Sequence, residues 1–199
     1  MTDVNKVKDE FVRFLYQSDW LAFKTMAEYY LQSAAKLKKK DIRAPHSLKL
    51  WIRNSTKRLF LGIGCELLLK SFYLKEGYCI NKPKQKGIKA IPTYKFDAID
   101  PNNFDHRDIY TFGPLIDNLK TIRKFQNQAQ IQKGFSIAMV FRNKEGHTTF
   151  ITHNFDRLNY TDIETGIIFF YQEAFNEKLY FQVSMAPKEQ GIFKINSAV

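Results

Sequence analysis

An arginine, an asparagine and a histidine stand close together in the stretch RNKEGH, where Arg142 and Asn143 precede His147. A guanidinium stabilises negative charge on a phosphate, and an imidazole transfers protons near neutral pH. Arg-to-His spacing alone has little weight, but an Asn directly after the Arg lowers the expected number of chance matches to on the order of 0.01. We therefore treat these three residues as a candidate site for phosphodiester chemistry.

Two local structures fit this segment. In a helix, Arg142 continues the inward stripe of Phe135 and Met139, and His147 lies at the C-terminal end, where the helix dipole favours the imidazolium form. A β-hairpin at about 135–153 fits as well, because the apolar residues also alternate, NKEG is typical of a turn and HTTFIT is rich in β-branched residues. The sequence alone leaves both open.

A second polar feature is the pair Glu66 and Lys70 in ELLLK. The two residues are spaced i, i+4 in the favourable order for a helical ion pair. They fall on a stripe of otherwise apolar residues: Ile52, Leu59, Ile63 and Tyr73. A carboxylate on such a stripe needs a cation, and Arg142 is the candidate, unless Glu66 lies at the border of the stripe with its carboxylate in solvent.

Apolar residues recur at helical spacing in six segments, at about 4–17, 20–39, 47–76, 114–125, 132–145 and from residue 161. The third is expected to be the longest helix. Gly62 and Gly64 in its middle each destabilise it by about 1 kcal/mol relative to Ala, which a close helix crossing could offset.

Local signals predict where several helices begin and end. Ser18 and Asp19 offer an N-cap for the second helix, and Pro114 suits the first turn of the fourth. Gly146 is expected to end the fifth helix. TDIE has the capping-box pattern, so the last helix is expected to begin at Thr161.

The last helix is apolar on more than one side. Ile163, Ile167 and Phe170 follow one stripe, whereas Ile168 and Phe169 lie off it. The extra apolar surface indicates either deeper burial in the domain or a dimer interface.

The segment 78–112 contains three prolines and no sustained period, and we expect it to be a long loop or insertion that contacts substrate or a partner. The tail at 184–199 adds a short strand, GIFKI, or packs along the outside. The fold class is therefore all-α or mainly α: a helical bundle forming a single domain over 1–199, with its core at about 20–180.

The formal net charge is +11 and the pI is near 9.5, with clusters such as KLKKK, TKR and KPKQKGIK. This charge makes a polyanion such as RNA a plausible partner, although a summed charge does not locate phosphate contacts. We find no signal-peptide pattern and no apolar run long enough to span a membrane, so a cytoplasmic protein without membrane contact is expected.

Other residues with reactive side chains lack supporting partners. Cys65 and Cys79 are too few for a disulfide framework and have no zinc-ligand spacing, so we expect buried thiols. His46, His106 and His153 are expected to be surface or capping histidines. No metal or cofactor motif is present in the sequence.

RNKEGH resembles the R-N-x-x-x-H signature of the HEPN domain family, and CELLLKSFYLKEGY (65–78) is similar to the family's helix with Glu and Lys. The resemblance covers about 20–180, with 78–112 as an insertion. It implies a helical bundle that forms a homodimer, in which two motifs build one metal-independent endoribonuclease site without a cofactor.

In that family, Arg142 would stabilise charge on the phosphate, His147 would transfer a proton and Asn143 would orient the site. Glu66 and Lys70 would support Arg142 or contact RNA. The products would be a 2′,3′-cyclic phosphate and a 5′-hydroxyl.

The biological role that the resemblance implies is that of a toxin or antiphage defence effector, controlled by an antitoxin or another regulatory protein. Control by nucleotidylation is doubtful, because Thr149 stands where silenced members have Tyr. The alternative is a catalytically silent HEPN-like module that binds RNA, a nucleotide or a protein partner. A third interpretation, an ordinary globular protein, leaves RNKEGH as a solvated helix end or turn.

Overall fold

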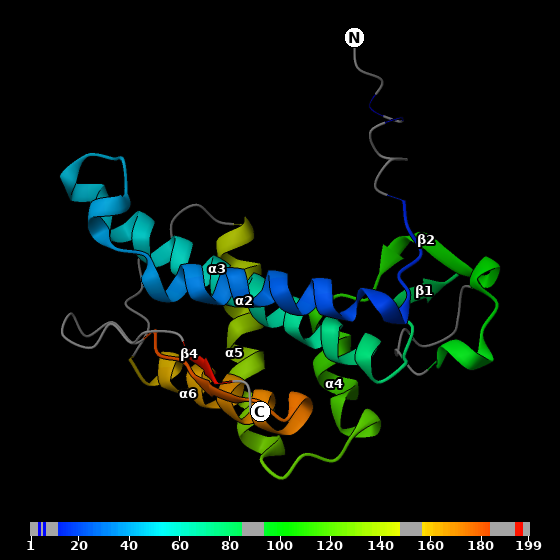
Figure 1. The fold of residues 1–199 in the computed structure, drawn as a ribbon. Helices are drawn as coiled ribbons and strands as arrows, with labels where there is room; N and C mark the ends of the chain where they lie inside the picture. The colour runs from blue at the N-terminus through cyan, green and yellow to red at the C-terminus, as the bar shows by residue number, and fades with distance from the viewer. Residues whose placement is uncertain are drawn as a thin grey trace.

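The computed structural model describes residues 4, 6, 12–84, 94–147, 157–183 and 194–196, and of residues 146, 147, 157, 158 and 194–196 the backbone only. This part of the chain is mainly helical, as predicted (Figure 1). Its α-helices are α2 (Trp20–Lys36), α3 (His46–Lys75), α4 (Phe112–Ile122), α5 (Gln128–His147) and α6 (Arg157–Phe170).

Helix α3 is the longest, as predicted, and lies at the centre of the bundle, where it contacts α2, α4 and α5. The turn that joins it to α2 contains the short helix η2 (Lys39–Asp41). One core of buried apolar side chains runs through all five helices, from Ala27 in α2 to Phe170 in α6. The elements around α3 therefore share a single hydrophobic core.

Two glycines of α3 lie where other helices cross it, as the sequence suggested. A Cβ on Gly62 would lie 2.8 Å from the carbonyl oxygen of Ala138 and 2.9 Å from the Cα of Arg142, both in α5. A Cβ on Gly64 would lie 2.8 Å from the Leu31 side chain in α2. Absence of a side chain at these two positions lets the three helices approach closely.

The sequence placed the start of α6 wrongly. The helix begins at Arg157, so Thr161 lies inside it and TDIE does not cap it. Tyr160 is only 1% exposed, and its ring packs 5.5 Å from that of Phe141 in α5. Packing of the Tyr160 ring on α5 stabilises helical structure before Thr161. A tertiary contact thus outweighs the local capping pattern here.

The apolar surface of α6 belongs largely to the core. Ile163, Ile167 and Phe170 are fully buried, and Ile168 and Phe169 are partly buried against the same core. This arrangement accords with the deeper-burial interpretation.

The predicted helix at 4–17 does not extend to its expected end, since residues 12–16 are not helical. The Leu15 N–H donates to the side chain of Asn81 at 2.9 Å. This hydrogen bond holds the segment before α2 against the chain that follows α3. Asp19 does not cap α2 with its side chain either. It accepts a hydrogen bond from the Tyr16 N–H at 2.8 Å and pairs with Arg13 at 2.6 Å, so it stabilises the turn before the helix.

The segment 78–112 is more regular than the predicted loop. It contains the antiparallel strands β1 (Asn81–Pro83) and β2 (Phe104–Ile109), with the short helices η3 (Phe96–Ala98) and η4 (Pro101–Asn103) between them. The buried Asn81 side chain donates to the carbonyl oxygens of Arg13 and Asp105. Neither strand shows a strict alternation of buried and exposed residues, and the hydrogen bond from Asn81 to Asp105 joins the two strands.

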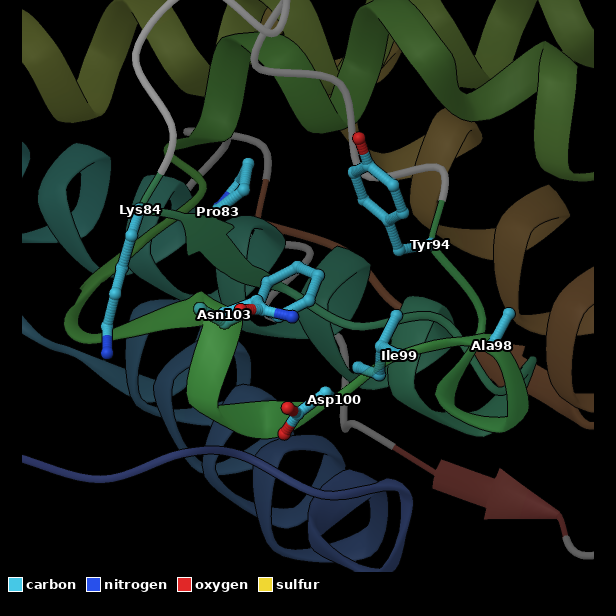
Figure 2. Close-up of a pocket in the computed structure, with 8 residues that line it drawn as sticks. Pro83, Lys84, Tyr94, Ala98, Ile99, Asp100 and Asn103 are labelled. Carbon is cyan, nitrogen blue, oxygen red and sulfur yellow. The ribbon is translucent and has the colours of Figure 1, made fainter.

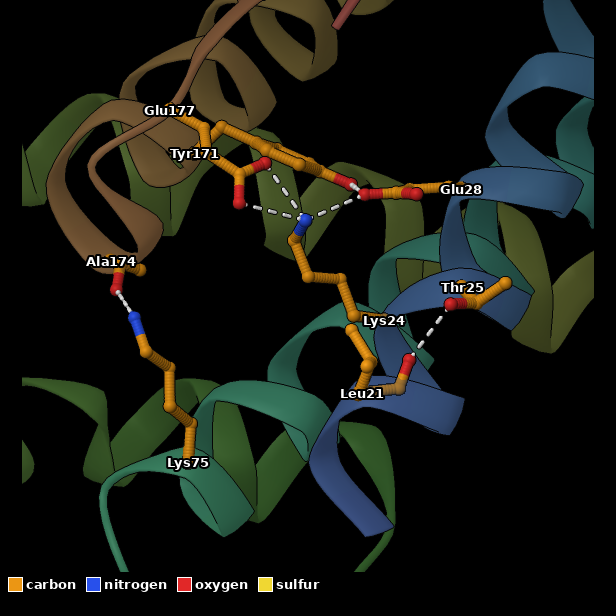
Figure 3. A network of polar contacts seen from close by, with 8 residues as sticks. All are labelled: Leu21, Lys24, Thr25, Glu28, Lys75, Tyr171, Ala174 and Glu177. Atoms are coloured by element: carbon orange, nitrogen blue, oxygen red, sulfur yellow. Dashed lines mark hydrogen bonds and ion pairs between the residues drawn. The ribbon is translucent and has the colours of Figure 1, made fainter. Parts of the chain in front are cut away.

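Beyond α6, the chain continues through the π-helical turn η5 (Tyr171–Phe175) to β3 (Lys178–Tyr180), which pairs with β4 (Lys194–Asn196). A C-terminal strand is thus present at Lys194–Asn196 and overlaps the end of the predicted GIFKI, of which residues 191–193 lie outside the described part of the chain. Figure 3 shows how Lys24 of α2 holds this segment: its Nζ lies 2.8 Å from Glu177 and 2.9 Å from Glu28. Lys75 Nζ also donates to the carbonyl oxygen of Ala174 at 2.9 Å.

Gly62→Ala is expected to lower the free energy of unfolding by on the order of 2 kcal/mol, because the methyl group meets the α5 backbone, which cannot rotate away. Urea unfolding followed by circular dichroism measures this. Gly113→Ala is the matched control, since its Cβ would lie 3.6 Å from Met139 Sδ, an ordinary contact. Equal stability of the two variants would contradict the close crossing.

Lys57→Met is expected to raise the free energy of unfolding at pH 7 by on the order of 2 kcal/mol. Lys57 is 2% exposed, and burial together with Arg53 lowers its pKa to about 8, against the opposite effect of Glu164.

The unfolded chain binds a proton at Lys57 up to its ordinary pKa, so the destabilisation is complete below pH 8 and disappears towards pH 10.5. Unfolding measured across this range should show the advantage of Lys57→Met shrinking as the pH rises. Lys133→Met, at a site whose side chain is 63% exposed, should change little. A stability difference between Lys57→Met and the wild type that does not change with pH would contradict a lowered pKa of Lys57.

Candidate functional site

Glu66 of α3 contacts two cations through different oxygens. Its Oε1 lies 2.7 Å from Lys70 Nζ, and its Oε2 lies 3.2 Å from Nε of Arg142 in α5. Glu66 and Lys70 are buried, whereas the Arg142 side chain is 38% exposed. The predicted pairing of Glu66 with Arg142 is confirmed, and the interpretation that places the Glu66 carboxylate in solvent is wrong.

The cluster of Glu66, Lys70 and Arg142 carries one negative and two positive charges. Arg142 uses Nε for Glu66, and its Nη1 donates to Asn143 Oδ1 at 3.3 Å. Asn143 itself is exposed. A guanidinium that is oriented by a buried carboxylate and still reaches solvent can receive an anionic group without first being ordered.

Gly62 explains how Arg142 comes to Glu66. The backbone of Arg142 packs on α3 at Gly62, one helical turn before Glu66. From there the arginine side chain extends along α3 to the carboxylate. The glycine, the carboxylate and the lysine therefore follow at intervals of four residues on one face of α3.

A second buried ion pair holds the end of α5. The Glu145 carboxylate accepts hydrogen bonds from Arg58 Nε and Ser55 Oγ of α3. The Glu145 side chain is 1% exposed and that of Arg58 is 6% exposed. This contact fixes the last turns of α5, three residues beyond Arg142.

The sequence analysis did not find the role of Glu145. A signal was present: in a helix, Glu145 lies three residues after Arg142 and thus on nearly the same inward face. The argument that gave Glu66 a cationic partner applies equally to Glu145, and Arg58 lies one turn before Gly62 on the face of α3 that meets α5.

The helical alternative for RNKEGH is confirmed, because α5 extends to His147, and the hairpin is wrong for residues 135–147. Gly146 does not end the helix, which continues one residue beyond it. The rest of the proposed hairpin, 148–153, lies outside the described residues, and so does the side chain of His147.

Helical geometry places Arg142 and His147 about 7.5 Å apart along the axis and about 140° apart around it. The two positions therefore lie on different sides of α5.

The remaining candidates have structural roles or none that the fold reveals. Cys65 and Cys79 are buried as predicted, and burial raises the pKa of both thiols. The pKa of Cys79 rises to about 11, although its hydrogen bond to the Asn81 backbone acts in the opposite direction. His46 is exposed at the first turn of α3, and the His106 ring lies 5.7 Å from that of Phe14.

A separate pocket of about 560 Å³ lies beside β1 and β2 (Figure 2). Its two charged side chains already have partners within the segment. Lys84 Nζ donates to the carbonyl oxygen of Asn102 at 2.7 Å, and Asp100 Oδ1 accepts from the Asn102 N–H at 2.9 Å. None of the predicted site residues lines this pocket, and we assign it no catalytic role.

Among the described residues, no group of three His, Cys, Asp or Glu side chains could hold a metal ion. None of the helices in this part of the chain is both long and apolar enough to cross a membrane. Comparisons of the chain with protein-family models, curated proteins and solved structures find no match.

Glu145→Gln is expected to lower the free energy of unfolding by on the order of 3 kcal/mol, because it removes the carboxylate that pairs with the buried Arg58 guanidinium. Guanidinium chloride unfolding measures the loss. Asp108→Asn is the control, since that carboxylate pairs with Lys82 at an exposed site and should matter by less than about 1 kcal/mol. Replacing both Arg58 and Glu145 by Met should recover part of the loss. Wild-type stability of Glu145→Gln would exclude the anchoring role.

Proposed function

We propose that this protein is a metal-independent endoribonuclease of the HEPN type. The observation that carries the proposal is the contact of Arg142 with Glu66 and, through it, Lys70. Two sequence segments that each resemble the family's pattern meet in space, on adjoining faces of α3 and α5. The basic character of the chain adds support, since RNA is a polyanion.

In the proposed reaction, the RNA 2′-hydroxyl attacks the adjacent phosphorus. The new bond joins the 2′ oxygen to phosphorus, and the bond from phosphorus to the 5′ oxygen breaks. A proton leaves the 2′ oxygen and another reaches the departing 5′ oxygen, with His147 as a proton-transfer group. Arg142 stabilises the charge that develops on the phosphate, and Asn143 orients the site. The products are a 2′,3′-cyclic phosphate and a 5′-hydroxyl.

Glu66 has a positioning role in this proposal. Its carboxylate holds the Arg142 guanidinium, and Lys70 balances the second oxygen of that carboxylate. The pair of helices therefore presents a pre-oriented cation at the surface.

A homodimer completes the proposed site. The wide angular separation of Arg142 and His147 around α5 favours contributions from two chains over a site on one helix face. The proposed biological role, as a cytoplasmic toxin or antiphage effector with an antitoxin or regulatory partner, rests on the family resemblance alone.

The test is cleavage of a mixed RNA pool by the purified protein in EDTA, with analysis of the product ends. Arg142→Ala and His147→Ala are each expected to reduce the rate by about a hundred-fold or more. Lys133→Ala is the matched control, because it removes an exposed cation from the same helix, about 14 Å along the axis from Arg142.

Cyclic-phosphate ends that appear with the wild type and the control alone would support the nuclease. RNA binding without cleavage would instead favour the silent binding module. Cleavage that persists in both site variants would refute the catalytic assignment.

A further inference from the structure

The turn between α2 and α3 and the helix ends beside it carry a dense group of positive charges, which we call the basic tip: Lys36, Lys38, Lys39, Lys40, Arg43, Lys49 and Arg53. Asp41 is the one acidic residue in the range 36–53, so seven cations face a single carboxylate. In Figure 1 this turn lies at the end of the molecule opposite to β1 and β2. Seven cations and one carboxylate thus give residues 36–53 a net charge of +6, out of +11 for the chain, at one end of the α2–α3 pair.

Most of these cations have no carboxylate partner among the described residues. Within the described part of the chain, the side chains of six of them form no ion pair, and the seventh, Arg53, donates to the carbonyl oxygen of Leu37 at 3.1 Å. Cations elsewhere in the fold do pair with carboxylates, as Lys24, Arg58 and Lys70 show. Unneutralised clusters of this kind attract polyanions.

Apolar side chains stand exposed beside the tip. Leu48, Trp51 and Ile52, in the first turns of α3, are 39%, 46% and 39% exposed. Ser55 and Gly62 lie on the face of α3 that meets α5. Leu48 and Trp51 lie on the same face, because they precede Ser55 at helical spacing. α5 covers this face of α3 from Ser55 onward and leaves the apolar stripe before Ser55 exposed.

The stripe also lies close to the candidate site. Trp51 is one helical turn, about 6 Å, before Ser55, which contacts Glu145 in the last turns of α5. From Trp51 to Gly62, beneath Arg142, the distance along α3 is about 16 Å. A strand bound along the stripe would reach the end of α5 directly.

We propose that the basic tip and the stripe of Leu48, Trp51 and Ile52 bind single-stranded RNA and lead it to the Arg142 site. The lysines contact phosphates, and unpaired bases stack on the indole of Trp51 and contact its aliphatic neighbours. A duplex keeps its base faces covered, so it can use the lysines but not the stripe. The delivery to Arg142 rests on the proposed nuclease function, whereas the binding itself does not.

The geometry favours a nucleic-acid strand over a membrane surface. A helix that lies on a bilayer has one apolar face open along its length. Here α5 covers the same face of α3 from Ser55 onward, and Leu50 is exposed on a different side of the helix. Because α5 rises from α3 directly beside the stripe, this surface is uneven. A flexible strand can follow it, whereas a flat bilayer cannot.

The test measures binding of a fluorescent 2′-O-methyl oligouridine, which lacks the 2′ nucleophile, by anisotropy in EDTA. Trp51→Ala is expected to weaken binding roughly ten-fold. Tyr29→Ala, which removes an exposed aromatic ring from α2, is the matched control and should bind like the wild type. Replacement of Lys38, Lys39 and Lys40 by Ala should lower the slope of log affinity against log salt by about two.

Unchanged affinity in Trp51→Ala and an unchanged salt slope in the triple variant would overturn the proposal, and so would Trp51-dependent binding to phosphatidylserine vesicles without binding to the oligomer. Cleavage of unmodified RNA separates the two proposals. Trp51-dependent binding without cleavage would leave this inference standing and remove the nuclease. If neither tip variant changes cleavage or binding, the nuclease proposal stands and this inference is overturned.

Discussion

The close crossing of α3 and α5 is the constraint on which the rest of the structure depends. At Gly62 the two backbones meet with no side chain between them. This contact determines how far the Arg142 side chain has to reach and brings Ser55 and Arg58 opposite Glu145. A wider crossing would separate Arg142 from Glu66 and Arg58 from Glu145, at a cost of several kcal/mol.

Several charged side chains are buried in the interior of this fold. Glu66, Glu145 and Lys24 are all buried or nearly buried, and each pairs with a partner from another helix or from the segment after α6. Ion pairs of this kind stabilise a fold less than apolar contacts do, but they penalise every arrangement that separates the partners. They therefore specify which faces of the helices meet.

The sequence predicted those parts of the structure that repeat along the chain. The apolar periodicity located α2, α3 and α4, and the lone carboxylate on the stripe of α3 identified the pairing of Glu66 with Arg142. It failed where a single distant contact decides the local structure. The strands held by Asn81 and the early start of α6 at Tyr160 depend on residues far away in the chain, which a local pattern cannot contain. The anchoring of Glu145 is different, because its place on the inward face of α5 is readable from the sequence and only its partners in α3 are not.

The bridge from Lys24 to Glu177 joins residues that are 153 positions apart. Contacts of such long range slow folding, because most of the chain must be ordered before they form. During synthesis, α2 leaves the ribosome long before Glu177 exists, so Lys24 and the apolar surface around it stay uncovered until the segment after α6 has been made. The contacts that bury Lys24 can thus form only once residue 177 has been synthesised, so the face of α2 that receives the segment after α6 is completed late.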